Sequence, residues 1–446
     1  MGEQGTRRRA WVLDVNMGYG HSRAAFALRD LSGGEIVTAN AYKGIPASDR
    51  KTWRQTRQLY EIVSRLKPIP LLGPGLFGAM DRIQRIPPFY PRRDLSRPNL
   101  QVRSIYHAIR RGFGRHLVET LAKDPVPLVT TFFSTAFAAE EHDYPGDIYC
   151  ITTDADVSRS WAPMDPKRSR IKYVASNGRV QERLKLYGVR EENIVLTGFP
   201  LPKQLIGGPE AGRLKEQLMA RVCNLDPEGI FTTRYAQTLR NELGAEHCKP
   251  PKRRHPLTVL YSVGGAGAQR RLGVEIMASL RHKIARGEMR FILSAGTRKD
   301  VAVYYRKAAA DLGLGRALDE HLLVPIFTDR LTYFEEFTRL LETTDVLWTK
   351  PSELSFYTGA GIAVVMAPPI GSQEVFNQTW LQYVGGGVPQ GDPKHTNEWL
   401  FDWIASGGLA RMAWNGYAEA PTHGTYRIED IVLGRKSVLP SLPLIV

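Results

Sequence analysis

Residues 11–21 of the chain read WVLDVNMGYGH: a mostly apolar run at 11–15, then a glycine-rich turn at 16–21 that leads into a helix-forming run from Ser22 to Asp30. A short apolar run is typical of a buried strand, and glycines let the chain turn tightly before a helix. Strand, glycine-rich turn and helix make the first unit of an open α/β sheet, with the turn at the carboxyl end of the strand. The stretch therefore predicts a doubly wound α/β fold.

Similar apolar segments recur along the chain, with helical stretches such as Val180–Tyr187 between them. The expected strands lie at 128–133, 148–153, 173–175 and 194–197 in the first half, and at 257–263, 291–293, 322–324, 345–348 and 362–366 in the second. This alternation predicts mostly parallel sheets with helices on both faces. We expect two Rossmann-type domains that face a central cleft.

The domain boundaries follow from changes in composition. The first α/β domain is expected at 1–208, with an insert at 66–115, and the second at 257–446. Residues 209–256 are predicted to form helices that end in a Pro-rich basic linker. We also expect the last helices of the chain to pack back on the first domain.

The composition is that of a globular protein with an anionic partner. Lys and Arg number 60 against 45 Asp and Glu, which gives a net charge of +15. Such an excess favours nucleic acid, a membrane surface or a phosphorylated substrate. The three cysteines lie far apart without CxxC spacing, so a disulfide framework and a Cys-rich zinc site are not expected, and a cytoplasmic setting is predicted.

The insert at 66–115 concentrates much of the positive charge. Residues 81–115 hold nine arginines and two aspartates, and 66–91 is rich in Pro, Gly and large apolar residues. This pattern suits a surface pressed against anionic lipid, and equally a solvated basic face over an ordinary loop. No spanning helix is expected, because the one long uncharged run, 354–373, is broken by Pro368 and Pro369.

Two glycine-rich turns are candidate binding sites. In the first, Gly18, Gly20 and His21 open a helix, where a histidine can accept a proton from a bound hydroxyl. In the second, residues 264–267 (Gly-Gly-Ala-Gly) follow a strand, where backbone N–H groups and a helix dipole favour a diphosphate. Either turn could also be a structural turn that binds nothing.

Polar side chains gather on two later loops, around Lys350 and around Glu374. A carboxylate there can accept hydrogen bonds from ribose hydroxyls, and neutral polar groups can hold phosphate and sugar oxygens. A third polar turn contains Asp154 and Asp156 directly after a strand. An Asp-X-Asp pair can hold a divalent metal, but the sequence favours acidic side chains that face the cleft without a metal.

Placed in order, these segments resemble the GT-B nucleotide-sugar glycosyltransferases. The chain is most similar to the monogalactosyldiacylglycerol synthase and processive diacylglycerol glucosyltransferase group, and more remotely to the peptidoglycan lipid-intermediate glucosaminyltransferase. The resemblance covers about residues 10–30, 145–205 and 257–385, and its segments are GYGHSRAA at 18–25, TD at 153–154 with Trp161 downstream, TGFPL at 197–201, VGGAG at 263–267, TKP at 349–351 and GSQE at 371–374.

The resemblance implies a UDP-sugar donor, a lipid acceptor, no metal and no other cofactor. His21 and Asp154 are the implied catalytic residues. The implied acceptor-binding residues are Gly18, Tyr19, Gly20, Ser22 and Trp161. The implied nucleotide-sugar-binding residues are Gly264, Gly265, Ala266, Gly267, Lys350, Ser352, Glu353, Gln373, Glu374 and Asn377. The chain departs from the family's donor motif, since Ser352 and Glu353 replace glycines and Ser372 is an additional residue before Gln373.

The sequence thus predicts a hexosyltransferase that is cytoplasmic and peripheral on the inner face of a membrane, bound through 66–115. Two alternatives keep the fold: a UDP-sugar 2-epimerase-like enzyme and a degenerate GT-B binding protein. Nucleic-acid binding is not expected, because aromatic residues are not interleaved with the arginines as stacking platforms require.

Overall fold

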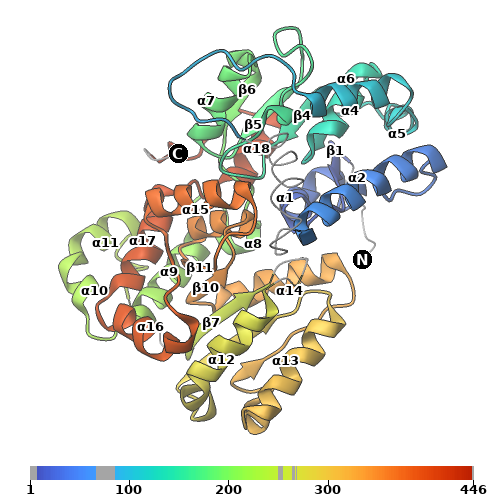
Figure 1. Ribbon diagram of the computed structural model, residues 1–446. Coiled ribbons are helices and arrows are strands. Elements are labelled where there is room, and N and C mark those ends of the chain that lie inside the picture. Colours follow the sequence, from blue (N-terminus) through green and yellow to red (C-terminus); the bar gives the residue numbers. More distant parts are fainter. Residues whose placement is uncertain (1–7, 67–85, 250–254, 264–266, 268, 444–446) are drawn as a thin grey trace, which may run out of the picture.

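The computed structural model describes residues 8–66, 86–249, 255–263, 267 and 269–443. They form two lobes, each built on a six-stranded parallel sheet (Figure 1). The first sheet has the order β2-β1-β3-β4-β5-β6. Its strands are β1 (Trp11–Asp14), β2 (Val37–Thr38), β3 (Leu128–Thr130), β4 (Ile148–Ile151), β5 (Lys172–Ala175) and β6 (Ile194–Leu196).

Helices cover both faces of the first sheet. Val12 of β1 packs in one apolar cluster with Ala25 and Leu28, whereas Leu13 packs in another with Trp53 and Leu117. Both clusters are buried, as expected for a parallel sheet. The helices are α1 (Tyr19–Ala27), α2 (Ala47–Leu66), α4 (Leu100–Arg110), α5 (Arg115–Leu121), α6 (Phe133–Glu141), α7 (Gly178–Leu186) and α8 (Lys203–Ile206), with 3-10 turns η1 (Arg29–Ser32), η2 (Arg159–Trp161) and η3 (Glu191–Asn193).

The second sheet has the order β12-β11-β10-β7-β8-β9. Its strands are β7 (Leu257–Ser262), β8 (Met289–Ser294), β9 (Leu322–Leu323), β10 (Val346–Thr349), β11 (Ala363–Met366) and β12 (Gly387–Pro389). Its helices are α12 (Arg270–Ala285), α13 (Lys299–Asp311), α14 (Arg330–Glu342), α15 (Ser372–Val384), α16 (Thr396–Ala405) and α17 (Gly408–Glu419), with 3-10 turns η4 (Gly315–Ala317), η5 (Glu353–Ala360) and η6 (Pro393–His395).

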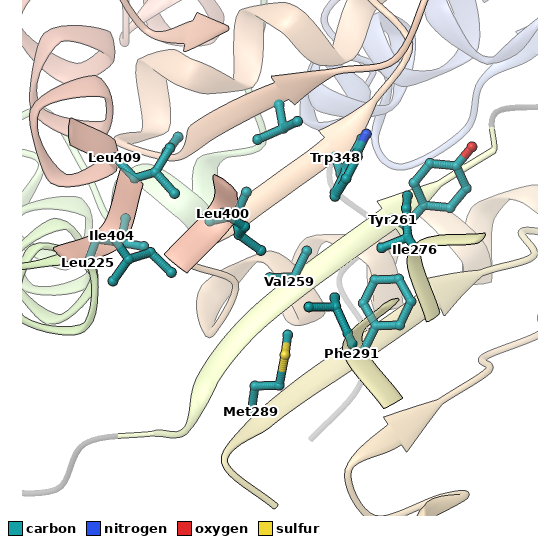
Figure 2. Close-up of a cluster of buried hydrophobic side chains, with 14 of the residues drawn as sticks. Leu225, Val259, Tyr261, Ile276, Met289, Phe291, Trp348, Leu400, Ile404 and Leu409 are labelled. Atoms are coloured by element: carbon teal, nitrogen blue, oxygen red, sulfur yellow. The ribbon is translucent and has the colours of Figure 1, made fainter. Parts of the chain in front are cut away.

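The core of the second lobe includes the helical segment that precedes its sheet. Figure 2 shows Leu225 of this segment beside Ile404 and Leu409. The buried guanidinium of Arg221 donates hydrogen bonds of 2.8–2.9 Å to backbone carbonyls of the second lobe. The segment, α9 (Gly212–Leu225), α10 (Ile230–Arg234) and α11 (Ala236–Leu243), is therefore integral to the second lobe.

The last helix, α18 (Gly424–Val432), returns to the first lobe. Its Ile428 and Val432 pack with Val12 and Val129 of the first sheet, and Figure 1 draws α18 in red beside β5. No helix in the described part of the chain is both long and apolar enough to cross a bilayer.

The predicted fold class, two doubly wound α/β lobes of GT-B type, is confirmed by the strand order. Each predicted apolar segment contains a strand. The short edge strands β2 and β12 were not predicted, because Val37–Thr38 and Gly387–Pro389 do not form apolar runs. The uncharged run after Glu353 forms the 3-10 turn η5 and then the buried strand β11, so it is not one long helix.

Candidate functional site

The two lobes carry polar residues at the points where their strand orders reverse. In the first sheet this point lies between β1 and β3, and in the second between β7 and β10. The loops that leave neighbouring strands there run in opposite directions and leave a space where ligands of open α/β sheets bind. The glycine turn before α1 follows β1, and Lys350 follows β10. The predicted glycine turn and the predicted Lys350 loop therefore both lie at a reversal point of a sheet.

Gly18 opens α1 in a conformation that requires glycine. Its φ is 125°, and a Cβ built there meets no atom within 4 Å. The backbone of the first turn is therefore open to an approaching ligand at Gly18. At Gly20 a Cβ would lie 3.5 Å from the side chain of Glu353, so this side of the turn is already covered by the second lobe.

His21 bridges the two strands of the first reversal point. Its Nδ1 lies 2.7 Å from the carbonyl oxygen of Thr131, the residue after β3. A carbonyl only accepts, so Nδ1 carries the proton and Nε2 is left as the basic nitrogen. The ring contacts those of Phe132 and Trp161, with centroids 4.9 and 6.3 Å apart.

Burial keeps the His21 imidazole neutral. Desolvation lowers its pKa to about 4, although the hydrogen bond to Thr131 and the carboxylate of Asp14 act in the opposite direction. A neutral imidazole with a free Nε2 can accept a proton from a hydroxyl. Trp161, in η2, is buried, and its ring centroid lies 5.3 Å from that of Phe133.

Asp154 lies where the two lobes meet. Its Oδ1 accepts a 3.2 Å hydrogen bond from Nδ2 of Asn377, which belongs to α15 of the second lobe. Burial raises the pKa of Asp154 to about 6, helped by Glu353 and Glu374 and opposed by Asn377 and Lys350. The structure thus brings together five of the predicted site residues from both lobes.

Asn377 is a structural link rather than an open ligand group. Only 1% of it is exposed. Its Oδ1 accepts from the backbone N–H of Ala155 at 2.7 Å, and Nδ2 also donates to the carbonyl of Pro351 at 3.3 Å. Both amide N–H groups are therefore used within the protein.

Lys350 and Glu374 form an ion pair beside Asp154. The second carboxylate oxygen of Glu374 accepts from the backbone N–H of Ile370 at 2.6 Å and caps the start of α15. Glu374 was predicted to contact the nucleotide sugar, and in this structure both of its oxygens are bound by the protein. Ser352, just before η5, and Gln373, in the first turn of α15, are both half-buried.

Glu353 pairs with an arginine of the first lobe. Its Oε1 accepts from Nε of Arg23 at 3.1 Å. Tyr19 also reaches across, since its hydroxyl lies 3.2 Å from Oγ1 of Thr297 and its ring lies 5.1 Å from that of Tyr333. These contacts join α1 to the second lobe.

The hydroxyl of Ser22 is hydrogen-bonded to a buried carboxylate. Its hydroxyl donates to Oδ2 of Asp14 at 2.5 Å, and Arg330 of α14 donates to the Ser22 oxygen at 3.0 Å. The other oxygen of Asp14 is buried and has no hydrogen-bond partner among the described residues. Ser22 was predicted to contact the acceptor, and here it contacts Asp14 and Arg330.

The glycine loop after β7 is described only at Gly267. This residue has a φ of 64° and is buried, and a Cβ there would lie 3.1 Å from Cγ2 of Val301. The predicted diphosphate contacts of Gly264, Gly265 and Ala266 fall outside the described residues.

The Asp-X-Asp pair is not arranged as two metal ligands. Asp156 is buried and forms a two-point ion pair with Arg183, with both distances 2.9 Å, so its oxygens are bound by cations. Within the described ranges no cluster of three or more His, Cys, Asp or Glu could hold a metal.

Sequence reasoning missed the partners that fix these side chains. They are the Thr131 carbonyl, Asp14, Arg23 and Arg330. Only Arg23 could have been noticed in the sequence, because a charged residue inside the small apolar run SRAAFA suggests a buried ion pair.

Comparisons with known proteins find relatives only among solved structures. No family model and no curated protein matches the chain. Acinetobacter baumannii MurG has 13% identity and a TM-score of 0.48 over 96% of this chain and 100% of its own. Staphylococcus aureus MnaA, solved with UDP, has 10% identity and a TM-score of 0.48 over 98% and 100%. The Neisseria meningitidis UDP-GlcNAc 2-epimerase has 12% identity and a TM-score of 0.47 over 96% and 100%. Since these TM-scores are below 0.5, the fold is defined here by its strand order alone.

Proposed function

We propose that the chain is a metal-independent glycosyltransferase that moves a hexose from a UDP-sugar to a hydroxyl of a lipid acceptor such as diacylglycerol. One observation carries the proposal: the reversal points of the two sheets bear complementary chemistry. The first reversal point offers a neutral imidazole, His21, and the loop after the neighbouring strand β4 adds the carboxylate of Asp154. The second reversal point offers a cation, Lys350, after β10.

In the proposed reaction the acceptor hydroxyl binds in the first lobe. Its oxygen attacks the anomeric carbon while the bond from that carbon to the diphosphate oxygen breaks, and UDP leaves with the electron pair. The hydroxyl proton passes to Nε2 of His21 or to the carboxylate of Asp154. Two groups of the second lobe stabilise the developing charge of UDP: Lys350 and the amides predicted at 264–268.

Asp154 lies between the proposed acceptor and donor sides. Lys350 lowers its pKa and Glu353 and Glu374 raise it, which places all four side chains within electrostatic reach of each other. A carboxylate in that position can orient the acceptor or take its proton. The cations Lys350 and Arg330 can neutralise a diphosphate without a metal.

The lipid acceptor is supported by the described part of the basic insert. Tyr90 and Leu100 are each 69% exposed, and the arginines around them are also exposed: Arg92, Arg93, Arg97, Arg103, Arg110, Arg111 and Arg115. Exposed apolar side chains among arginines suit the surface of an anionic membrane. The remaining part of the insert, 67–85, falls outside the described residues.

The experiment is a screen of UDP-sugars with the full chain, with and without liposomes that contain diacylglycerol. We expect one UDP-sugar to release UDP and to yield a glycosylated lipid only when liposomes are present. Release of an isomerised sugar without lipid would establish the 2-epimerase instead. Absence of UDP release and of isomerisation with every sugar would contradict the proposal.

A further inference from the structure

Arg23 is a charged side chain of the first lobe that is buried by the second. It lies on α1 two residues after His21, and only 2% of it is exposed. Its Nε donates to Glu353 at 3.1 Å, and Nη2 donates to the hydroxyl of Tyr333 at 2.7 Å. Both partners belong to the second lobe, so the two lobes share this hydrogen-bonded group.

The rest of the guanidinium faces aromatic rings of α14. Its central carbon lies 4.2 Å from the ring centroid of Phe337 and 4.9 Å from those of Phe334 and Tyr333. Rings at this distance attract a cation, and the attraction is strong when water is excluded. We call these three rings with Glu353 the arginine socket.

The arginine socket lies next to the loop after β10. Glu353 begins η5, three residues after Lys350, and its side chain is 11% exposed. A Cβ on Gly20 would lie 3.5 Å from this side chain, so the first turn of α1 rests against it. His21 is therefore connected to the proposed donor loop through a short chain of buried contacts.

We propose that Arg23 is a positioning residue that fixes α1, and with it His21, relative to the loop after β10. Removing the guanidinium would leave the Glu353 carboxylate buried without its partner. Separating the lobes would break the ion pair and the hydrogen bond to Tyr333. The kinetic consequence rests on the proposed function, whereas the coupling of the lobes does not.

The coupling is tested by differential scanning calorimetry of the full chain. The variant is Arg23→Met, which keeps the volume and removes the charge. The matched control is Arg29→Met, because Arg29 also pairs across the lobes with α14, at Glu335, but on the surface. We expect the wild type and the control to unfold in one transition and Arg23→Met to unfold in two, as uncoupled domains do. A single transition in Arg23→Met, with the same midpoint as the control, would overturn the proposal.

The positioning role is tested by kinetics of the same variants. Arg23→Met is expected to lower kcat of transfer by about 100-fold, the effect of a small misplacement of reacting groups. Its Kd for UDP should match that of the wild type, because the proposed donor contacts belong to the second lobe. Arg23→Lys keeps the charge but loses the planar fork, so it should recover part of kcat.

Two outcomes separate this inference from the proposed function. If the wild type turns over no UDP-sugar, the proposed function fails and the calorimetry alone decides on Arg23. If the wild type is active and Arg23→Met keeps the wild-type kcat, the positioning role is wrong although the proposed function stands.

Discussion

His21 has a hydrogen-bonding arrangement that selects one tautomer. Nδ1 donates to the Thr131 carbonyl, and Nε2 makes no hydrogen bond to any residue that the structure describes. The ring is also neutral at physiological pH, because desolvation lowers its pKa to about 4. A fixed, neutral imidazole with one free nitrogen is suited to accept a proton from a bound hydroxyl.

Replacement of His21 by Ala should therefore affect turnover and leave donor binding intact. We expect kcat of transfer to fall by roughly 100-fold or more, the usual contribution of a positioned base. Calorimetry with UDP should give the wild-type Kd. His142→Ala is the matched control, because His142 also contacts a backbone carbonyl, that of Phe113, in the first lobe. Wild-type kcat in His21→Ala would remove this residue from the mechanism.

Asp154 is expected to set the acidic limb of the pH profile. Burial raises its pKa to about 6 from an ordinary value of 3.8, so its carboxylate is lost as the pH falls through 6. His21 with a pKa of about 4 stays neutral over that range. We expect kcat/KM to decline about tenfold per pH unit below 6. Asp154→Asn should be nearly inactive, and its residual kcat/KM should not show this decline. A flat wild-type profile between pH 5 and 7 would exclude a role for the ionised Asp154.

At the scale of single elements, α15 holds the lobes together through Asn377. Its side chain makes three hydrogen bonds, of which two reach Asp154 and Ala155 in the first lobe. Asn377→Ala would leave the buried N–H of Ala155 without a partner, which costs about 1–3 kcal/mol. We expect a lower melting temperature for this variant. Gln378→Ala, a half-buried neighbour on the same helix, is the control and should melt like the wild type.

The elements themselves could be predicted from the sequence, and their contacts could not. Continuous apolar runs located most of the strands, because a strand of a parallel sheet is buried on both faces, as β1 and β10 show. The roles of Asn377 and Glu353 depend on side chains 223 and 330 residues away, Asp154 and Arg23. No local pattern encodes such pairs, since they exist only once the two lobes are oriented against each other.

A similar reason explains the loop residues. Glu374 was expected to contact the ligand because it is a carboxylate on a polar loop. It is also the third residue of α15, and it caps that helix by accepting from the N–H of Ile370. A Glu at this helix position is a known capping signal that the sequence could have supplied. Its pairing with Lys350, from another loop, could not have been read from the sequence.

The whole molecule is predicted to associate with anionic membranes through the first lobe. Residues 86–115 carry seven arginines and one aspartate, with Tyr90 and Leu100 exposed among them. Co-sedimentation with liposomes that contain phosphatidylserine should be strong at low salt and should fall as salt screens the charges. The triple change of Arg97, Arg103 and Arg111 to Glu should abolish it. The same change at Arg281, Arg316 and Arg411 of the second lobe is the control, and equal losses in both would contradict a specific surface.

We propose that the second lobe binds a nucleoside diphosphate at the carboxyl ends of its strands. Calorimetric titration with UDP tests it most directly, on the wild type, His21→Ala and Gly267→Val. Gly267 has a positive φ and Val301 beside it, so a branched side chain there would distort the loop after β7. We predict one UDP per chain for the wild type and His21→Ala, and much weaker binding for Gly267→Val. No heat with the wild type, or equal binding by Gly267→Val, would contradict nucleotide binding by the second lobe at this loop.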